Sequence, residues 1–357
     1  MNVATPAEAG LRRFSLAIDA MGGDHAPESV LDGLVLAAER HPRAQFLLVG
    51  DEARLTPLLA ARPAAARVCA IRHAPDAIPG DMKPTAALRQ GRNSSMRLAI
   101  DAVAQGEAAG VVSAGNTGAL MALAKIVVKT MPEIGRPALA AIAPSARGDV
   151  VMLDLGANVQ CDARNLVEFA IMGDAFARAV LGLPGPSIGL MNVGSEELKG
   201  DDRVRQAAEV LRAPSTALNF HGFIEGHDIA AGTVDVVVMD GFTGNVALKT
   251  GEGALKLMRD MLRQVFTSSI PARMGYLLAR PALDRLREWM DPRRYNGAIL
   301  LGLNGVVVKS HGGTDATGFA HAVDVAMDMV THGFIQQIRD SLSRLATPGP
   351  SVTAPQD

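Results

Sequence analysis

The chain has 357 residues, of which 48% are hydrophobic, 20% charged and 4% aromatic, with a formal net charge of −2. Such a chain can bury a large core, its charge gives no general attraction to nucleic acid, and its few aromatic residues disfavour a base-stacking surface. Two cysteines, Cys69 and Cys161, form no disulfide framework and favour a reducing, cytoplasmic setting. No apolar run reaches the roughly 20 residues that span a bilayer, and residues 1–13 lack the apolar centre of a signal peptide.

In chain order, short apolar runs alternate with segments of helical spacing, which predicts an α/β fold with a doubly wound parallel sheet. Strands are expected at 14–20, 46–49, 110–113, 139–143, 150–154, 188–192 and 234–240. Helices are expected at 27–40, 52–61, 94–104, 117–131, 163–181, 202–212, from 244 onward and at 318–345. We expect an N-terminal extension over 1–13, one large domain over 14–346, and a disordered, proline-containing tail over 347–357.

Five glycine-rich turns each follow an apolar strand-like run, and they are the most informative feature of the sequence. In an open parallel sheet, ligands bind outside the carboxyl ends of the strands, and glycine lets the backbone approach them closely. The pattern predicts one cleft that holds a phosphate-like or acyl substrate. The turns span residues 19–25, 113–118, 154–158, 192–195 and 240–245.

These turns and a few nearby polar residues supply the candidate site. Each candidate also has a structural alternative, such as a helix cap, a tight turn or a solvated surface charge. The catalytic candidates are Asp24, His25, Asn116, Asn245, Lys309 and His311. The candidates for binding substrate or phosphate are Gly22, Gly23, Lys83, Arg92, Ser94, Ser95, Thr117, Gly118, Asp154, Asn158, Asn192, Gly194, Gly241, Thr243 and Gly244.

Several common site motifs do not occur in the sequence. No G-x-G-x-x-G follows the first strand and no G-x-x-x-x-G-K-[ST] is present, which disfavours a dinucleotide fold and a P-loop. No H-E-x-x-H or C-x-x-C occurs either, so a zinc site is not indicated. We therefore expect no metal and no organic cofactor.

Eight motifs resemble the bacterial phosphate acyltransferase family, in order and at similar spacing from about Leu16 to about Ile338. They are DAMGGDHAP (19–27), NSSM (93–96), SAGNTGALMA (113–122), DLGANVQC (154–161), NVGSEELKG (192–200), NFHGFIEGHDI (219–229), DVVVMDGFTGNVALKTGEG (235–253) and LLGLNGVVVKSHG (300–312). The resemblance implies conversion of acyl-acyl carrier protein and inorganic phosphate into acyl phosphate for phospholipid synthesis. It also implies an α/β/α sandwich related to phosphotransacetylases and isocitrate-type dehydrogenases, usually a homodimer with a peripheral membrane habit.

The sequence departs from the family pattern at a few positions. Residues 1–13 extend beyond the usual start, and His227 stands where the family often has Arg. Asn296 and Ile299 replace a common Gly and Pro. These changes concern local loop geometry and the role of position 227.

The implied chemistry suits the residue types in the turns. Phosphate is already anionic near neutral pH, and a thiol leaving group with a pKa near 8.5 needs no strong acid. The protein has to hold an anion beside an acyl group and stabilise an oxyanion, which backbone N–H groups, Asn and Thr side chains and a cation can do.

The segment 254–294 is a second distinct feature, an expected amphipathic helical hairpin with a turn around Ser268–Gly275. It carries nine basic and four acidic residues, a net charge of +5, so the rest of the chain nets −7. One interpretation is a buried dimer interface, and another is a tip that dips into an anionic membrane surface. An acidic carrier protein could also dock on its arginines. The candidates for membrane or partner contact are Val265, Phe266, Arg273, Leu277 and Leu278.

Three functions remain open from the sequence. The first is an acyltransferase that uses acyl carrier protein thioesters, which the long apolar hairpin favours. The second is a phosphotransacetylase that uses coenzyme A thioesters. The third is a non-catalytic membrane-surface scaffold for carrier protein, which would not need the five turns.

Overall fold

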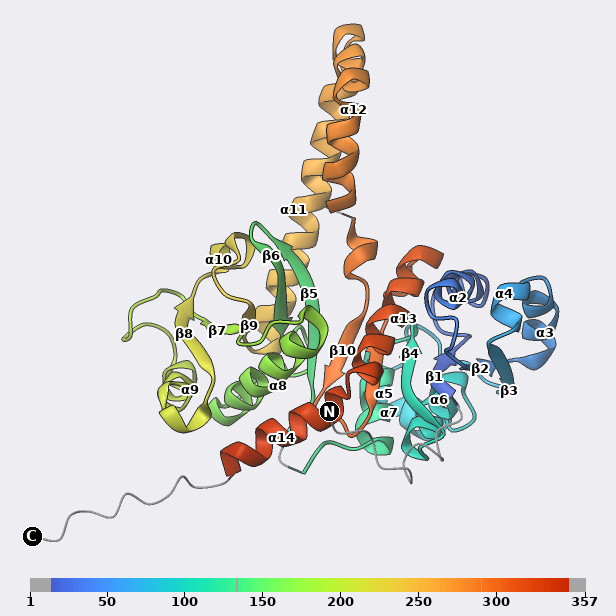
Figure 1. Ribbon diagram of the computed structural model, residues 1–357, viewed down its shortest axis with the longest axis horizontal. Helices are drawn as coiled ribbons and strands as arrows, with labels where there is room; N and C mark the ends of the chain where they lie inside the picture. Colours follow the sequence, from blue (N-terminus) through green and yellow to red (C-terminus); the bar gives the residue numbers. More distant parts are fainter. Residues whose placement is uncertain (1–13, 133, 290, 347–357) are drawn as a thin grey trace, which may run out of the picture.

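The computed structural model of the chain describes residues 14–132, 134–289 and 291–346. The expected N-terminal extension and the expected disordered tail therefore lie outside the described residues. Within them, one sheet of eleven strands forms the centre of the molecule (Figure 1). Its strands, in spatial order, are β3 (Cys69–His73), β2 (Phe46–Gly50), β1 (Phe14–Asp19), β4 (Ala108–Ser113), β11 (Val306–Lys309), β10 (Ala298–Leu301), β5 (Ala138–Ser145), β6 (Gly148–Leu153), β9 (Val236–Val238), β7 (Ser187–Met191) and β8 (Asn219–Ile224).

The sheet is mostly parallel, but its two halves run in opposite directions. Strands β3, β2, β1, β4 and β11 are mutually parallel, and so are β6, β9, β7 and β8. Between the halves, β10 is antiparallel to both β11 and β5, and β5 is antiparallel to β6. The carboxyl ends of the two parallel groups therefore point toward opposite edges of the sheet.

Helices cover both faces, so the architecture is the expected α/β/α sandwich. Alternate residues of a strand point to opposite faces; Val306 and Val308 enter one core, while Val307 enters the other. The first core includes residues of α2 (Glu28–Arg40), α3 (Glu52–Ala60), α4 (Pro63–Ala66), α8 (Ala163–Leu181), α9 (Asp202–Arg212), α13 (Ala316–Thr331) and α14 (Phe334–Ala346). The second core is covered by α5 (Pro84–Gln90), α6 (Ser95–Ala104), α7 (Thr117–Val127), α10 (Gly226–Ala231) and the start of α11 (Gly241–Thr267).

A long hairpin of α11 and α12 (Ile270–Trp289) projects from the body (Figure 1). The expected turn over Ser268–Gly275 is wrong in extent, because only Ser268 and Ser269 separate the helices. Pro271 lies in the first turn of α12, where a backbone N–H has no partner within the helix, so it does not break the helix. Through η2 (Pro292–Tyr295) the chain returns to β10. Among the described helices, none is sufficiently long and apolar to span a membrane.

Most expected elements are confirmed, with one clear error near the C-terminus. The helix expected at 318–345 is two helices, α13 and α14. Gly333 between them has a φ of +63°, a left-handed conformation that ends the first helix. Strands β3, β8 and β10 and the short helices α4, α5 and α10 were not predicted from the sequence.

Candidate functional site

All five turns follow strands as expected, after β1, β4, β6, β7 and β9. The expectation of one cleft is wrong, because the opposed directions of the two half-sheets divide the turns into two clusters. Cluster 1 consists of residues 19–25, 113–118 and 309–313, after β1, β4 and β11. Cluster 2 consists of residues 154–161, 192–195 and 240–245, after β6, β7 and β9. No hydrogen bond or ion pair between described residues joins them.

Asp19 is the buried centre of cluster 1. Its carboxylate accepts hydrogen bonds from Ser95 Oγ at 2.6 Å and Ser113 Oγ at 2.7 Å, and from the Met21 N–H at 3.3 Å. Burial raises the pKa of Asp19, and these hydrogen bonds oppose that rise. Asp19 thereby ties the end of β1 to the end of β4 and to the start of α6.

The glycines of cluster 1 allow its turns to pack backbone against backbone. A β-carbon on Gly22 would lie 2.5 Å from Asp19 Oδ2 and 2.7 Å from the Gly115 nitrogen. At Gly23, which has a φ of +114°, a β-carbon would lie 3.2 Å from the Gly312 carbonyl oxygen. The Asp24 N–H donates to that same oxygen at 2.9 Å. The three turns of cluster 1 are thus in direct contact.

Lys309 is the buried cation of cluster 1, with only 8% of its surface exposed. Its Nζ donates to the Ala114 carbonyl oxygen at 3.3 Å and to the Ser310 carbonyl oxygen. Burial lowers the pKa of Lys309 to about 8, and the charges of Asp19 and Asp24 partly oppose that shift. An ammonium has three hydrogens, so one more acceptor can bind here.

The other candidates near cluster 1 have mixed roles. Asn116 caps α7, because its Oδ1 accepts from the Ala119 N–H at 3.0 Å and its Nδ2 donates to the carbonyls of Gly80 and Met82. Ser94 caps α6 as expected, accepting from the Arg97 N–H at 3.2 Å. The side chains with open access to solvent are those of Asp24, His25, Lys83, Arg92, Thr117 and His311, while Gly118 packs against Pro84.

Asp154 is the corresponding buried carboxylate of cluster 2. It accepts from the backbone N–H groups of residues 139, 156, 157 and 158 at 2.6–3.2 Å, and from Asn158 Nδ2 at 2.9 Å. Burial raises the pKa of Asp154, and these donors oppose the rise. Asn158 Nδ2 also donates to the Pro137 carbonyl oxygen at 2.7 Å. Both side chains therefore brace the turn after β6.

Helix α11 begins directly on that braced turn. A β-carbon on Gly244 would lie 1.9 Å from the Asp154 carbonyl oxygen, and one on Gly241 would lie 2.6 Å from the Asn158 carbonyl oxygen. Asp240 caps the helix by accepting from the Thr243 N–H at 2.8 Å. Both glycines are required by close packing.

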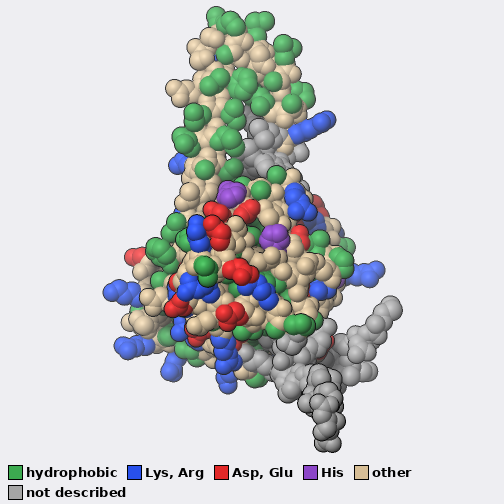
Figure 2. Space-filling model, turned by 90° about the vertical axis from the view of Figure 1, so that its left-hand side faces the viewer, with side chains coloured by type: hydrophobic (Ala, Val, Ile, Leu, Met, Phe, Trp, Pro, Cys, Tyr) green, Lys and Arg blue, Asp and Glu red, His purple; other side chains and the backbone are tan. Residues whose placement is uncertain are grey.

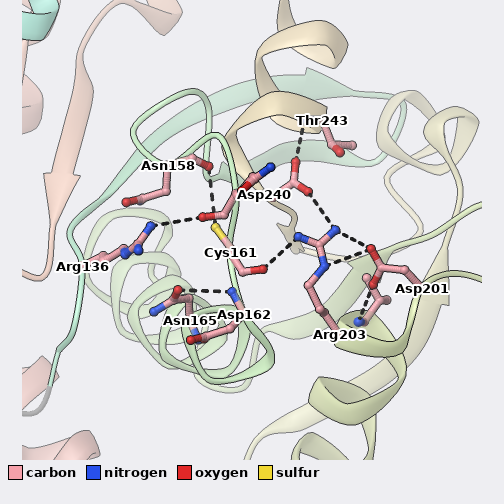
Figure 3. A network of polar contacts seen from close by, with 11 residues as sticks. Arg136, Asn158, Cys161, Asp162, Asn165, Asp201, Arg203, Asp240 and Thr243 are labelled. Atoms are coloured by element: carbon pink, nitrogen blue, oxygen red, sulfur yellow. Dashed lines mark hydrogen bonds and ion pairs between the residues drawn. The ribbon is translucent and has the colours of Figure 1, made fainter.

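An arginine that was not among the predicted site residues connects two loops of cluster 2 to the start of α9 (Figure 3). Arg203 donates to the Cys161 carbonyl oxygen at 2.9 Å, pairs with Asp201, and lies 3.9 Å from Asp240 Oδ2. Its only sequence signal is its place in the first turn of α9.

Burial raises the pKa of the Cys161 thiol to about 11 and that of Cys69 to about 12, so neither is activated as a nucleophile.

The remaining candidates of cluster 2 lie at its rim. Asn192 bridges its own loop, donating to the Lys199 carbonyl oxygen at 3.0 Å and accepting from the Val193 N–H at 2.9 Å. A β-carbon on Gly194 would lie 2.6 Å from Glu196 Oε2. Asn245 is exposed, with Nδ2 3.4 Å from the Leu155 carbonyl oxygen. No group of three metal-ligating side chains occurs among the described residues.

The hairpin exposes large apolar side chains far from both clusters. Figure 2 shows them distributed over the projection, whereas charged side chains gather on the body. Val265, Leu277 and Leu278 are exposed, Leu278 to 86%, and so is Arg273. Phe266 instead packs edge-on against Tyr276, with ring centroids 5.6 Å apart, so it holds the two helices together.

Comparisons with known proteins identify the family. A family model described as "Fatty acid synthesis protein" matches residues 14–337. A phosphate acyltransferase of Gluconacetobacter diazotrophicus is 71% identical over 338 residues, which cover 95% of this chain and 90% of the relative. One of Granulibacter bethesdensis is 70% identical, covering 93% and 90%. The chain belongs to the phosphate acyltransferase family. It is accordingly an enzyme, a transferase.

Solved structures extend the likeness to the fold. The EutD phosphotransacetylase of Staphylococcus aureus superposes with a TM-score of 0.57 at 16% identity, covering 90% of this chain and 96% of that one. A phosphotransacetylase of Streptococcus pyogenes superposes with a TM-score of 0.59 at 18% identity, covering 92% and 99%. These likenesses confirm the α/β/α sandwich and nothing finer.

Proposed function

We propose that this enzyme transfers a long-chain acyl group from the thioester of acyl carrier protein to inorganic phosphate, giving acyl phosphate for phospholipid synthesis. A phosphate oxygen attacks the thioester carbonyl carbon, the carbon–sulfur bond breaks, and the carrier leaves as a thiolate that takes up a proton. Atoms and charges balance without a redox partner or a further substrate.

Phosphate binds at cluster 1 in this proposal. The Lys309 ammonium is the buried cation of that cluster, and it has a hydrogen left for an additional acceptor. A cation in a poorly solvated site stabilises an anion more strongly than one in water. Asp24, His25 and His311 are exposed beside it and are the groups available to a substrate entering from solvent.

Asn116 acts in this proposal through the backbone it holds. Its amide group is occupied by the α7 cap and by two carbonyls of the loop before α5. Asn245 lies in cluster 2, at the opposite edge of the sheet, with its Nδ2 3.4 Å from the Leu155 carbonyl oxygen, so we assign it no contact with phosphate at cluster 1.

The projecting hairpin is the observation that supports a long acyl chain and an acyl carrier protein as the substrate. It combines exposed apolar side chains with a net charge of +5 over 254–294. Such a surface suits an anionic membrane face, where a fatty acyl product partitions, and an acidic carrier protein. We include in the proposal a cytoplasmic homodimer that associates peripherally with the membrane.

A phosphotransacetylase that uses coenzyme A thioesters is the second candidate, because the fold is shared with solved phosphotransacetylases. The deciding experiment measures acyl phosphate formation with inorganic phosphate and palmitoyl-acyl carrier protein, with palmitoyl- and acetyl-coenzyme A in parallel. Phosphate-dependent turnover of the carrier thioester is expected. Turnover of acetyl-coenzyme A alone would select the second candidate, and no turnover by folded protein would favour a scaffold.

A further inference from the structure

Asn296 is a buried polar side chain, 8% exposed, in the segment that returns from the hairpin to the sheet. It lies between η2 and β10, two residues before the strand begins. Its Nδ2 donates to Ser310 Oγ at 2.8 Å and to the Gly318 carbonyl oxygen at 2.7 Å, with Thr314 Oγ1 at 3.3 Å. Its Oδ1 accepts from the His311 N–H at 2.8 Å.

All the side-chain hydrogen-bond partners of Asn296 belong to the segment 309–318, which joins β11 to the first turn of α13. Ser310 is fully buried, and its N–H donates to the Ser113 carbonyl oxygen at 2.9 Å. The segment is therefore held from one side by the turns of cluster 1 and from the other side by Asn296. Lys309 and His311 flank the residue whose hydroxyl Asn296 binds.

Room for this side chain is created by Gly318. A β-carbon there would lie 2.1 Å from Thr314 Oγ1 and 3.3 Å from Asn296 Nδ2. Arg293 makes a second link across the same junction, from η2 to Asp315 Oδ2 at 3.0 Å. Asp315 caps α13 by accepting from the Gly318 N–H at 3.0 Å.

We propose that Asn296 is a positioning residue that holds the segment 309–318 so that the Lys309 ammonium faces bound phosphate. This inference rests on the proposed function, since it gives Lys309 a phosphate partner. The side chain acts at a distance from the substrate. Its loss displaces the cation without removing it.

The matched control is Asn304, at the opposite end of the β10–β11 pair. Its Nδ2 donates to the Thr130 carbonyl oxygen at 2.9 Å and lies 3.3 Å from that of Lys129. Asn304→Asp therefore removes side-chain hydrogen bonds at the same pair of strands without touching the segment 309–318, and it keeps the Oδ1 that accepts from Arg339 Nη2 at 3.2 Å. Asn296→Asp and Asn304→Asp are compared in the full-length chain for unfolding free energy and for kinetics.

We expect Asn296→Asp to raise the KM for phosphate about tenfold or more, since an unsatisfied buried hydrogen-bonding group costs enough for that change. The KM for the thioester is expected to stay within about twofold of the wild-type value. Asn304→Asp is expected to leave the KM values for phosphate and for the thioester within about twofold of the wild type. Should Asn296→Asp fail to fold, Ser310→Ala removes only the 2.8 Å acceptor and is expected to shift the phosphate KM in the same direction. The proposal would be overturned if the Asn296 variant, or the Ser310 variant used in its place, had the same KM for phosphate as the Asn304 variant.

A second readout separates this inference from the proposed function. Mass spectrometry after brief treatment with an amine-acylating reagent reports the accessibility of Lys309 relative to exposed Lys125. Asn296→Asp is expected to increase the labelling of Lys309, and Asn304→Asp is not. Absent turnover by the wild-type enzyme would reject the proposed function, whereas unchanged Lys309 labelling would reject the positioning role.

Discussion

The Nζ atom of Lys309 lies 3.3 Å from the carbonyl oxygen of Ala114, across the boundary between two neighbouring parallel strands. The two residues are 195 positions apart in sequence, and each follows or ends an apolar run. Their contact places a cation beneath the turn before α7. The electrostatics of cluster 1 therefore depend on how β4 and β11 pair.

Phosphate use is predicted to fall as pH rises through about 8. Burial lowers the pKa of Lys309 to about 8, so the ammonium that attracts phosphate is lost at a pH where most lysines stay charged. The measurement is kcat/KM for phosphate between pH 6 and roughly 9.5. In Lys309→Met, the residual kcat/KM for phosphate is expected to lack this fall at alkaline pH, because the variant has no ammonium to lose. The titration of phosphate itself affects both proteins alike. An equal fall of kcat/KM in both proteins would contradict the role of the Lys309 ammonium in phosphate binding.

The same group is predicted to make stability rise with pH. The pKa of Lys309 is about 8 in the folded chain and 10.5 in the unfolded chain, so the unfolded chain binds more protons between these values. Its contribution to the free energy of unfolding therefore increases from pH 8 to pH 10.5 and is level below pH 8. Urea unfolding across that range should have a smaller upward slope in Lys309→Met than in the wild type.

Gly244→Ala is predicted to destabilise the fold by at least about 3 kcal/mol, at the upper end of overpacking costs. The added β-carbon would lie 1.9 Å from the Asp154 carbonyl oxygen, a backbone atom held by the braced turn after β6. Gly251→Ala is the control in the same helix, since its β-carbon has no neighbour within 4 Å. That variant should gain roughly 0.5–1 kcal/mol, because alanine restricts the unfolded chain and favours helix. Urea unfolding of both variants checks the contrast.

The sequence predicted the strand-end turns because glycine, apolar runs and capping residues are local signals. It could not predict the two clusters, since the reversal of direction at β10 and β5 arises from pairing between distant strands. Strand β10 was not predicted either, because its four residues carry no periodic signal. Arg203 was not selected, and Asn296 was noted only as a departure from the family pattern, because the partners of both side chains are groups that only the tertiary fold brings to them.

Membrane association is predicted to depend on the tip of the hairpin. Replacing Leu277 and Leu278 with Ser removes exposed apolar surface at the tip and should abolish sedimentation with anionic phospholipid vesicles, while activity in solution stays unchanged. Phe266 is left in place, because its contact with Tyr276 holds the hairpin together. Ile126→Ser combined with Leu198→Ser is the control, since both residues are exposed apolar residues outside the hairpin. Undiminished sedimentation of the tip variant would exclude the membrane role.

Dimer formation is predicted to depend on a different part of the hairpin. On α11, a shallow hollow that extends from Ala254 to the last turn before the tip is lined almost wholly by apolar atoms of Ala254, Leu257, Met258, Met261, Leu262 and Val265. A second copy of α11 packed there would remove this surface from water, so Leu257→Asp with Met261→Asp should give monomers by light scattering after gel filtration. Lys256→Asp with Arg263→Asp, on the same helix but outside the hollow, controls for added charge. If the Leu257 and Met261 variant remains dimeric while the tip variant becomes monomeric, the dimer contact is at the tip and the membrane role has to be reassigned.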